Sequence, residues 1–299
     1  MYILLYPDIF IYYLENRDSL SKSKKQNLIN NLIESDATKI VLSEYYLSKI
    51  QEYFTDQNKS AFFEKSLQRL IDFYSTSKFH IIKYNKQGDL MSCFNNMGAS
   101  LGKQEIVYLL KNSDSSNLEF ISYDNLVESP TSLGWIKLNL LTNKNLNFDH
   151  SEFKTNAEIQ SFFENFLKLL SNKNLLVFSR DHLVDASIFS SIKSNKFNVS
   201  YYTRNFETSV NRRALSNDVL KNVLSSLKNK LGKNSELWVT NNPDLIHERR
   251  MVSTPFKLIL DDDFNNLDVK RKTWSISLIR DERKCEDYIK KCSKFNQFK

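Results

Sequence analysis

The chain has 299 residues, which is long enough for two domains of ordinary size, each with its own hydrophobic core. Its 41% hydrophobic and 13% aromatic content excludes a disordered chain, and its low content of Gly (5) and Pro (4) argues against a turn-rich β-sandwich. The three cysteines have no metal-ligand spacing, which fits a cytoplasmic protein in a reducing compartment.

Charge is divided unevenly along the chain. Residues 1–150 carry 16 Lys and Arg against 17 Asp and Glu, a net charge of −1, and residues 151–299 carry 26 against 18, a net charge of +8. A near-neutral half joined to a basic half favours one part that performs chemistry and one part that contacts a polyanion. A basic surface that only keeps the protein soluble is the alternative.

In the first half, apolar runs alternate with segments of helical periodicity. The opening MYILLYPDIFIYYL is too short to span a membrane and carries Asp8 in its middle, so it predicts a buried strand and the start of a helix, with no membrane segment. Strands are predicted at 2–6, 38–43, 79–84 and 118–123. Helices are predicted at 26–35, 44–54, 61–77 and 102–113.

The second half shows the same alternation. Strands are predicted at 174–179, 198–203, 236–240, 247–253 and 256–260. Helices are predicted at 157–170, 185–194 and 216–231, the last ending at Gly232, a favourable C-cap residue. The final RDERKCEDYIKKCSKFNQFK is of mixed charge and predicts a solvated helix and tail.

Together these patterns predict an α/β fold in both halves, with largely parallel sheets and crossover helices. The polar stretch 141–156 is the expected boundary between them. It gives a first domain at 1–145 and a second domain at 150–299 with a C-terminal helical tail.

Carboxylates follow the predicted strands of the first half. Asp8, Glu44 and Asp124 each come after a strand, and Glu105 lies in the first turn of the predicted helix 102–113. The carboxyl ends of parallel strands share one sheet edge, so these groups are expected to converge there, and clustered carboxylates require a hard cation such as Mg²⁺ or Mn²⁺. The alternative is that acids follow strands because Asp favours turns and helix N-caps.

The order of these acids resembles that of the PIN-domain nucleases, over roughly residues 1–130. YILLYPDIFIYYL, IVLSEYYLSKIQEYF, GKQEIVYLL and FISYDN carry the resemblance. It implies a parallel sheet with helices, metal binding by Asp8, Glu105 and Asp124, and cleavage of RNA more often than DNA. The family's second acid lies inside its helix, where this chain has Ser48 and Lys49, so Glu44 and Glu52 both stand as candidates.

In the second half, DLIHERRMV resembles the H-x-K-x4-D motif of the phospholipase D superfamily, within an α/β half-domain at about 172–268. The resemblance makes His247 the candidate nucleophile and Arg249 the phosphate-binding cation. Thr254 replaces the motif's Asp, although one of Asp261–Asp263 could orient the histidine. Two such halves form one site in this superfamily, so a nucleophilic His247 requires a homodimer. A structural or phosphate-contacting His247 is the other interpretation.

Further basic and aromatic residues lie near this motif. Arginines can bind phosphates and tyrosines can stack on unpaired bases. The tyrosines are Tyr201 and Tyr202, which could instead pack inside the fold as strand residues. The candidate phosphate-binding residues are His247, Arg204, Arg212, Arg213, Arg249 and Arg250.

The two resemblances predict a metal-dependent nuclease of the bacterial defence or toxin-effector type. Its catalytic residues would be Asp8, Glu44, Glu105 and Asp124, and its basic second domain would bind nucleic acid, a partner protein or its own copy. Two alternatives stay open. The second domain could be a metal-independent phosphodiesterase that acts through His247 in a dimer, or both sites could have decayed in a protein that only binds or regulates.

Overall fold

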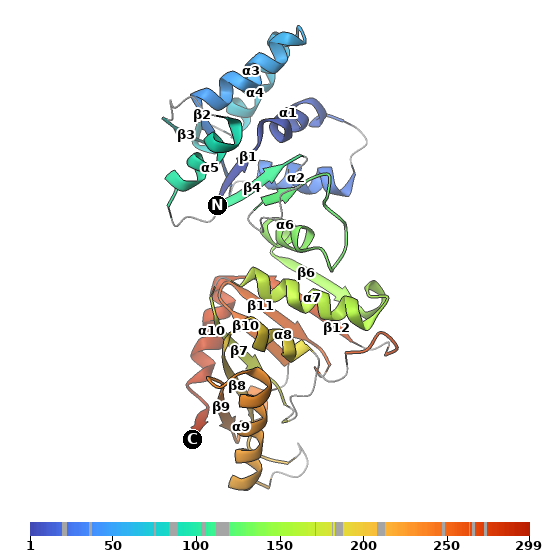
Figure 1. Cartoon of the computed structure of the whole chain (residues 1–299), viewed down its shortest axis with the longest axis vertical. Coiled ribbons are helices and arrows are strands. Elements are labelled where there is room, and N and C mark those ends of the chain that lie inside the picture. The colour runs from blue at the N-terminus through green and yellow to red at the C-terminus, as the bar shows by residue number, and fades with distance from the viewer. Residues whose placement is uncertain are drawn as a thin grey trace. The chain divides into compact units, whose positions relative to one another are not determined.

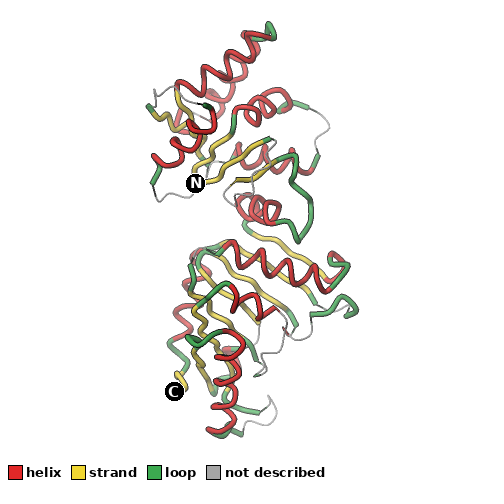
Figure 2. The backbone as a smooth tube through the Cα atoms, viewed as in Figure 1, coloured by secondary structure: helices red, strands yellow, loops and turns green. Residues whose placement is uncertain are grey.

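A computed structural model describes residues 1–19, 23–35, 38–74, 76–83, 89–102, 106–111, 120–170, 172–180, 182, 188–207, 213–246, 249–262, 264, 267–271 and 274–299, without the side chains of residues 73, 74, 76, 90, 120 and 243. The chain forms two compact units, Met1–Glu128 and Ser129–Lys299. Each contains a sheet and helices, which confirms the predicted α/β fold class (Figures 1 and 2).

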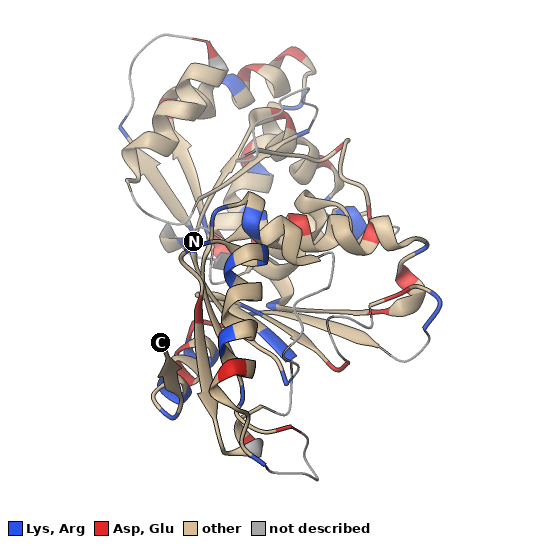
Figure 3. Ribbon diagram, turned by 60° about the horizontal axis from the view of Figure 1, so that its bottom comes forward, with Lys and Arg blue, Asp and Glu red and all other residues tan. Residues whose placement is uncertain are grey.

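The two units differ in charge. The first has 14 Lys and Arg against 16 Asp and Glu, a net charge of −2, and the second has 28 against 19, a net charge of +9. Figure 3 marks these residues on the ribbon. The charge contrast expected between the two halves of the sequence therefore also separates the two units.

The first unit is built around five parallel strands in the order β3-β2-β1-β4-β5. Ile3, Leu4 and Leu5 of β1 are all buried, as expected for a parallel sheet covered on both faces. The strands are β1 (Tyr2–Leu5), β2 (Lys39–Ser43), β3 (Phe79–Ile82), β4 (Ile106–Leu110) and β5 (Phe120–Ser122). The helices are α1 (Pro7–Asn16), α2 (Lys24–Glu34), α3 (Glu44–Asp56), α4 (Ser60–Tyr74), η1 (Thr76–Lys78) and α5 (Leu90–Ser100).

The prediction of a helix at 102–113 is wrong, because this stretch contains the strand β4. The run IVYLL is apolar throughout, and a short apolar run fits a buried strand and a buried helix equally well. The helix of this region is α5, which the periodicity did not reveal. Its N-cap was a usable signal, since Asp89 accepts a hydrogen bond from the Ser92 backbone N–H at 2.8 Å.

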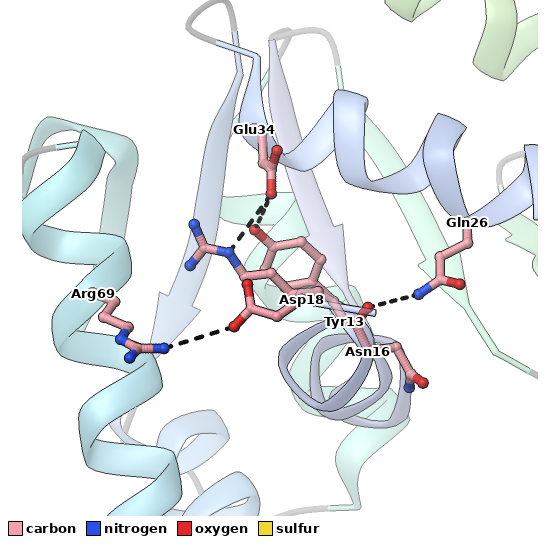
Figure 4. Close-up of polar contacts among 7 residues, drawn as sticks. Tyr13, Asn16, Asp18, Gln26, Glu34 and Arg69 are labelled. Atoms are coloured by element: carbon pink, nitrogen blue, oxygen red, sulfur yellow. Dashed lines mark hydrogen bonds and ion pairs between the residues drawn. The ribbon is translucent and has the colours of Figure 1, made fainter. Parts of the chain in front are cut away.

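Polar contacts hold the C-terminal end of α1 to its neighbours (Figure 4). Tyr13 Oη donates a hydrogen bond to Glu34 of α2 at 2.9 Å, and Gln26 Nε2 donates to the Asn16 carbonyl oxygen at 3.0 Å. Just beyond the helix, Asp18 lies 3.7 Å from Arg69 of α4. These contacts fix the direction of α1, whose other end carries Asp8.

The second unit has eight strands in the order β13-β9-β8-β7-β10-β11-β12-β6. Its strands are β6 (Asn145–Asp149), β7 (Asn174–Phe178), β8 (Asn198–Arg204), β9 (Glu236–Thr240), β10 (Arg249–Ser253), β11 (Phe256–Leu260), β12 (Ser275–Arg280) and β13 (Asn296–Phe298). Its helices are α6 (Leu133–Asn143), η2 (His150–Glu152), α7 (Asn156–Leu169), α8 (Ile188–Ser194), α9 (Asn217–Leu231), η3 (Pro243–Leu245) and α10 (Glu282–Cys292).

A largely parallel sheet was expected in the second unit, and that expectation is wrong. Only β7, β8 and β9 pair in parallel, whereas β10, β11, β12, β6 and β13 are added antiparallel. The turn at Thr254 and Pro255 joins β10 to β11 directly, and a connection this short allows only antiparallel pairing.

The stretch 141–156, expected to separate the domains, contains the end of α6 and all of β6. Because β6 pairs with β12 along its whole length, the stretch belongs to the second unit. The C-terminal segment is also integrated into this unit rather than a solvated tail. Cys285 of α10 and the following Phe295 are buried, and β13 pairs with β9. Among the described residues, no helix is long and apolar enough to cross a membrane.

Candidate functional site

Asp8 lies in the first turn of α1, directly beyond the carboxyl end of β1. Pro7 occupies the start of the helix, where its missing N–H costs no hydrogen bond, so strand and helix meet with a single residue between them. Burial raises the pKa of the Asp8 carboxyl group, and the charge of Asp124 adds to this, whereas hydrogen bonding and charge from Lys111 lower the pKa. A cation near Asp8 would therefore favour its ionised form.

Lys111, the residue after β4, connects the two carboxylate residues. Its backbone N–H donates a hydrogen bond to Asp8 Oδ1 at 3.4 Å, and its carbonyl oxygen accepts one from the Asp124 backbone N–H at 2.8 Å. Asp124 lies two residues beyond β5 and is exposed. The structure thus brings Asp8 and Asp124 to one sheet edge, as their positions after strands predict.

This edge contains the topological switch point of the sheet, where the order in which strands are added changes from one side of β1 to the other. From β1 the chain adds β2 and β3 on one side, then crosses over to add β4 and β5 on the other. In open α/β sheets, ligands bind beyond the carboxyl ends of the strands at such a switch point. Asp8 and Lys111 follow the two strands, β1 and β4, that flank it.

The other predicted acids do not join Asp8 in the described structure. Glu44 begins α3 and is exposed, and Glu52 forms an ion pair with Lys49 at 2.6 Å. Glu105 lies outside the described residues. It was expected at the start of a helix, but Ile106 begins β4, whose amino end is at the opposite edge of a parallel sheet from Asp8.

A pocket of about 350 Å³ opens beside Asp8. Asp8, Ile11, Tyr12 and Glu15 face it from α1, as their helical spacing allows, and further residues come from α3 and from the end of β4. The lining residues are Tyr6, Pro7, Asp8, Ile11, Tyr12, Glu15, Lys49, Tyr53 and Lys111. Glu15, Lys49 and Lys111 were not among the site residues predicted from the sequence. Lys111 was not predicted because the segment that forms β4 was expected to be helical, and Lys111 therefore did not follow a predicted strand.

Aromatic rings and lysines share this pocket. The Lys111 ammonium lies 5.5 Å from the centre of the Tyr12 ring. Tyr12 Oη lies 3.4 Å from Tyr123 Oη, and this hydrogen bond, followed by burial, raises the pKa of Tyr12 to about 12. Tyr12 is therefore neutral at physiological pH and offers a ring face and a hydroxyl group. The pocket combines carboxylates, two lysines and flat apolar walls.

Within the part of the chain that the structure describes, no three His, Cys, Asp or Glu side chains group as metal ligands. Asp8 and Asp124 interact at the carboxyl edge of the sheet, and Glu44 follows β2 at the same edge. The predicted third ligand, Glu105, is outside this part of the chain, so the Mg²⁺ or Mn²⁺ site stays a prediction.

In the second unit, Arg249 and Arg250 point to opposite faces of the sheet. Successive side chains alternate along a strand, and Met251 lies in the core beneath α7, α8 and α9 while Val252 packs towards α10. The Arg250 guanidinium accordingly lies 4.4 Å from the ring centre of Tyr288 on α10. These two candidate phosphate-binding residues therefore face opposite sides of the sheet.

His247 and Arg212 lie outside the described residues. Arg204 ends β8, where its guanidinium lies 5.8 Å from the Phe206 ring and its carbonyl oxygen is 2.9 Å from His182 Nε2. Arg213 is exposed, and its carbonyl oxygen accepts a hydrogen bond from the Glu207 backbone N–H at 3.2 Å. Of the two arginines, only Arg213 has an exposed side chain.

The tyrosines near these arginines are part of the core. Tyr201 is 0% exposed and Tyr202 is 4% exposed, and the Tyr202 ring stacks on Phe178 with centroids 4.7 Å apart. Neither ring is available for base stacking. Asp261, a candidate to orient His247, instead accepts hydrogen bonds from the Ser275 backbone N–H and hydroxyl group, both at 2.6 Å.

The sequence matches no protein-family model and no curated protein. Solved structures that resemble the chain include a member of the phospholipase D family. Nuc of Salmonella typhimurium, a phospholipase D family member, is 10% identical with a TM-score of 0.35, over 52% of this chain and 97% of that chain. NucT of Helicobacter pylori is 10% identical with a TM-score of 0.34, over 52% and 99% of the two chains.

A third similar structure is that of TrmBL2, an archaeal chromatin protein whose structure shows a novel mode of DNA binding. It is 8% identical with a TM-score of 0.34, over 85% of this chain and 70% of that chain. At this identity and these TM-scores, none of the likenesses assigns a role to a residue of this chain.

Proposed function

We propose that the first unit is a metal-dependent phosphodiester hydrolase that cleaves nucleic acid. The observation that carries this proposal is the arrangement around Lys111, whose backbone contacts both Asp8 and Asp124 at the carboxyl edge of the sheet. The arrangement adjoins a pocket with two lysines, Lys49 and Lys111, at the switch point where α/β sheets bind ligands. The resemblance to PIN nucleases favours RNA over DNA as the substrate.

The donor chemistry of this edge fits Mg²⁺ or Mn²⁺. Mg²⁺ is commonly bound by one or two carboxylates together with waters and substrate phosphates. Asp8 and Asp124 would supply the carboxylates, and Glu105, which directly precedes the amino end of β4, is not assigned to this set. When bound, such an ion generates a nucleophilic water at neutral pH and stabilises the charge that develops on a phosphodiester.

The chain's own residues would bind and orient the substrate. Lys49 and Lys111 carry positive charge at the pocket and would attract phosphate oxygens. The rings of Tyr12 and Tyr53 would contact a base or a ribose by stacking. Because the pKa of Asp8 is raised, its carboxyl group holds a proton more readily than an ordinary Asp, and a bound cation would displace that proton.

The second unit would hold the polyanion. Its net charge of +9 favours contact with phosphates, an interaction that weakens as salt is raised. A partner protein or a second copy of the chain is the other candidate for this surface. Such a pairing of a nuclease with a basic unit suits a bacterial defence or toxin effector.

The test is cleavage of labelled single-stranded RNA and DNA of one sequence in Mg²⁺ or Mn²⁺. We expect Asp8→Asn and Asp124→Asn each to lower the cleavage rate by roughly 10²-fold or more, and EDTA to abolish cleavage. Asp72→Asn is the matched control, because Asp72 is an exposed carboxylate on α4 that does not line the pocket.

A phosphodiesterase site in the second unit would behave differently. Cleavage through a nucleophilic His247 would persist in EDTA, vanish in His247→Ala and depend on protein concentration because a dimer is required. That result, or unchanged cleavage by the Asp8→Asn, Asp124→Asn double variant, would overturn the proposal.

A further inference from the structure

The second unit contains a pocket of about 490 Å³. Three chain segments form it: the junction of α6 and β6, the turn between β10 and β11, and the junction of β12 and α10. The lining residues are Lys144, Pro255, Arg280, Asp281, Glu282 and Arg283.

Backbone hydrogen bonds hold the three segments together. The Arg280 N–H donates to the Lys144 carbonyl oxygen at 2.8 Å, and the Asp281 N–H donates to the Pro255 carbonyl oxygen at 2.9 Å. The backbone around the pocket is therefore fixed by the fold before any ligand binds. Such preorganisation lowers the entropy cost of binding.

The charges around the pocket favour an anion. Lys144, Arg280 and Arg283 supply three cations against two carboxylates, those of Asp281 and Glu282. The Asp281 carboxylate is already engaged as the N-cap of α10, where it accepts a hydrogen bond from the Lys284 backbone N–H at 3.1 Å. The charged side chains that line the pocket therefore carry a net charge of +1.

We propose that this pocket binds a phosphate monoester. Arginine guanidinium groups bind phosphate oxygens in a bidentate manner, and a lysine adds a compact positive charge. The volume falls in the range of about 300–1,000 Å³ typical of small-molecule sites, so the pocket has room for a nucleotide as well as for its phosphate group. The ligand is a free nucleotide or the terminal phosphate of a nucleic-acid strand. The proposal does not depend on cleavage by the first unit.

Lys144 provides a variant that separates binding from folding. This residue is the C-cap of α6 and has a left-handed backbone with φ of 59°, a conformation that favours glycine. Lys144→Gly removes the cation and also relieves the backbone strain, so a loss of binding in this variant cannot be attributed to unfolding. Arg283→Gln removes a second cation from an exposed position, and Lys221→Gln, on the exposed surface of α9, is the control.

The experiment is calorimetric titration of the full-length chain in EDTA at constant ionic strength. Its probes are adenosine monophosphate, adenosine, and one oligonucleotide with either a 5′-phosphate or a 5′-hydroxyl. We expect the phosphorylated member of at least one pair to bind roughly tenfold or more tightly than its unphosphorylated counterpart. Lys144→Gly and Arg283→Gln should each weaken binding of the phosphorylated ligand by a similar factor, which is the size expected for loss of a hydrogen bond to a charged group. Lys221→Gln should bind as the unaltered chain does.

The two pairs distinguish the source of the phosphate. Discrimination with the oligonucleotides alone supports the proposal with a strand end as the ligand, and discrimination with adenosine monophosphate supports it with a free nucleotide. Equal binding within both pairs, or phosphate-dependent binding that Lys144→Gly and Arg283→Gln leave unchanged, would overturn it.

Discussion

At the scale of single residues, the carboxyl group of Asp8 is held where burial opposes its ionisation. Its folded-state pKa is raised, first by burial and further by the charge of Asp124. Residues at functional sites often lower the stability of the unliganded protein, because the charge that is unfavourable in the absence of the ligand is the charge that binds the ligand. The cost should be visible in the stability of the unliganded chain.

We predict that Asp8→Asn stabilises the first unit at neutral pH in the absence of metal. Below the pKa of the unfolded state, Asp8 is protonated in both states and resembles Asn, so the variants should be equally stable. As the pH rises through the raised folded-state pKa, the unaltered chain alone loses stability. Differential scanning calorimetry in EDTA should therefore show a higher Tm for Asp8→Asn at neutral pH and no difference at acid pH.

Asp72→Asn serves as the comparison, because Asp72 is an exposed carboxylate on α4 that does not line the pocket. A lower Tm for Asp8→Asn than for the unaltered chain at neutral pH would contradict the burial argument. Addition of Mn²⁺ should raise the Tm of the unaltered chain more than that of Asp8→Asn, because only the former keeps both carboxylates.

At the scale of elements, α5 packs against β4 at a point that has no room for a side chain. A Cβ atom added to Gly98 of α5 would overlap with Tyr108 Oη and lie 2.7 Å from Tyr108 Cζ. The Tyr108 ring is itself held edge-on against Phe94, with centroids 5.4 Å apart. The same strand β4 pairs with β1 and is followed by Lys111, whose backbone contacts Asp8 and Asp124.

We predict that Gly98→Ala destabilises the first unit by about 1 kcal/mol. Alanine gains roughly 1 kcal/mol of helix propensity over glycine, but overpacking of a buried contact costs about 1–3 kcal/mol. The net loss should appear as an earlier first-unit transition in urea denaturation. Asn95→Ala, at an exposed position of the same helix, should show no loss.

The double variant Gly98→Ala, Tyr108→Leu checks the cause. Leucine removes the ring atoms nearest to the new Cβ, so Gly98→Ala should cost less in that background than alone. An equal cost in both backgrounds would mean that the clash with Tyr108 is not the reason.

At the scale of the whole molecule, the chain divides between Glu128 and Ser129 rather than within the polar stretch 141–156. The strand β6 pairs with β12 over five residues, and Ile136 and Leu140 of α6 are fully buried in the core of the second unit. A fragment that begins after β6 would expose that core and leave β12 as an unpaired edge, which favours aggregation.

We predict that residues 129–299 fold on their own and that residues 150–299 are much less stable. The shorter fragment loses a strand and the apolar side chains of α6, each of which typically contributes about 2–5 kcal/mol when buried. Thermal unfolding followed by circular dichroism should give a cooperative transition for 129–299 and a lower Tm or precipitation for 150–299. Equal Tm values would show that α6 and β6 belong with the first unit.

Local pattern alone determined much of this protein. The alternation of strands and helices, the contrast in charge between the two halves and the positions of Asp8 and Asp124 after strands follow from hydrophobic periodicity and composition. These features are local because side-chain spacing along a strand or helix is set by backbone geometry within a few residues. The alternation of side chains along a strand, which places Arg249 and Arg250 on opposite faces of the sheet, is also local and follows from the sequence once a strand is predicted there.

Only the tertiary structure decided which segments pair and which side chains meet. The run IVYLL suits a helix or a strand, and it becomes β4 because it fits between β1 and β5 with its apolar side chains buried. The same pairing brings Lys111 between Asp8 and Asp124, and the direction of α1 brings Glu15 to the pocket in place of Glu44. Such contacts join residues far apart in the sequence, and their energies depend on packing that no local window contains.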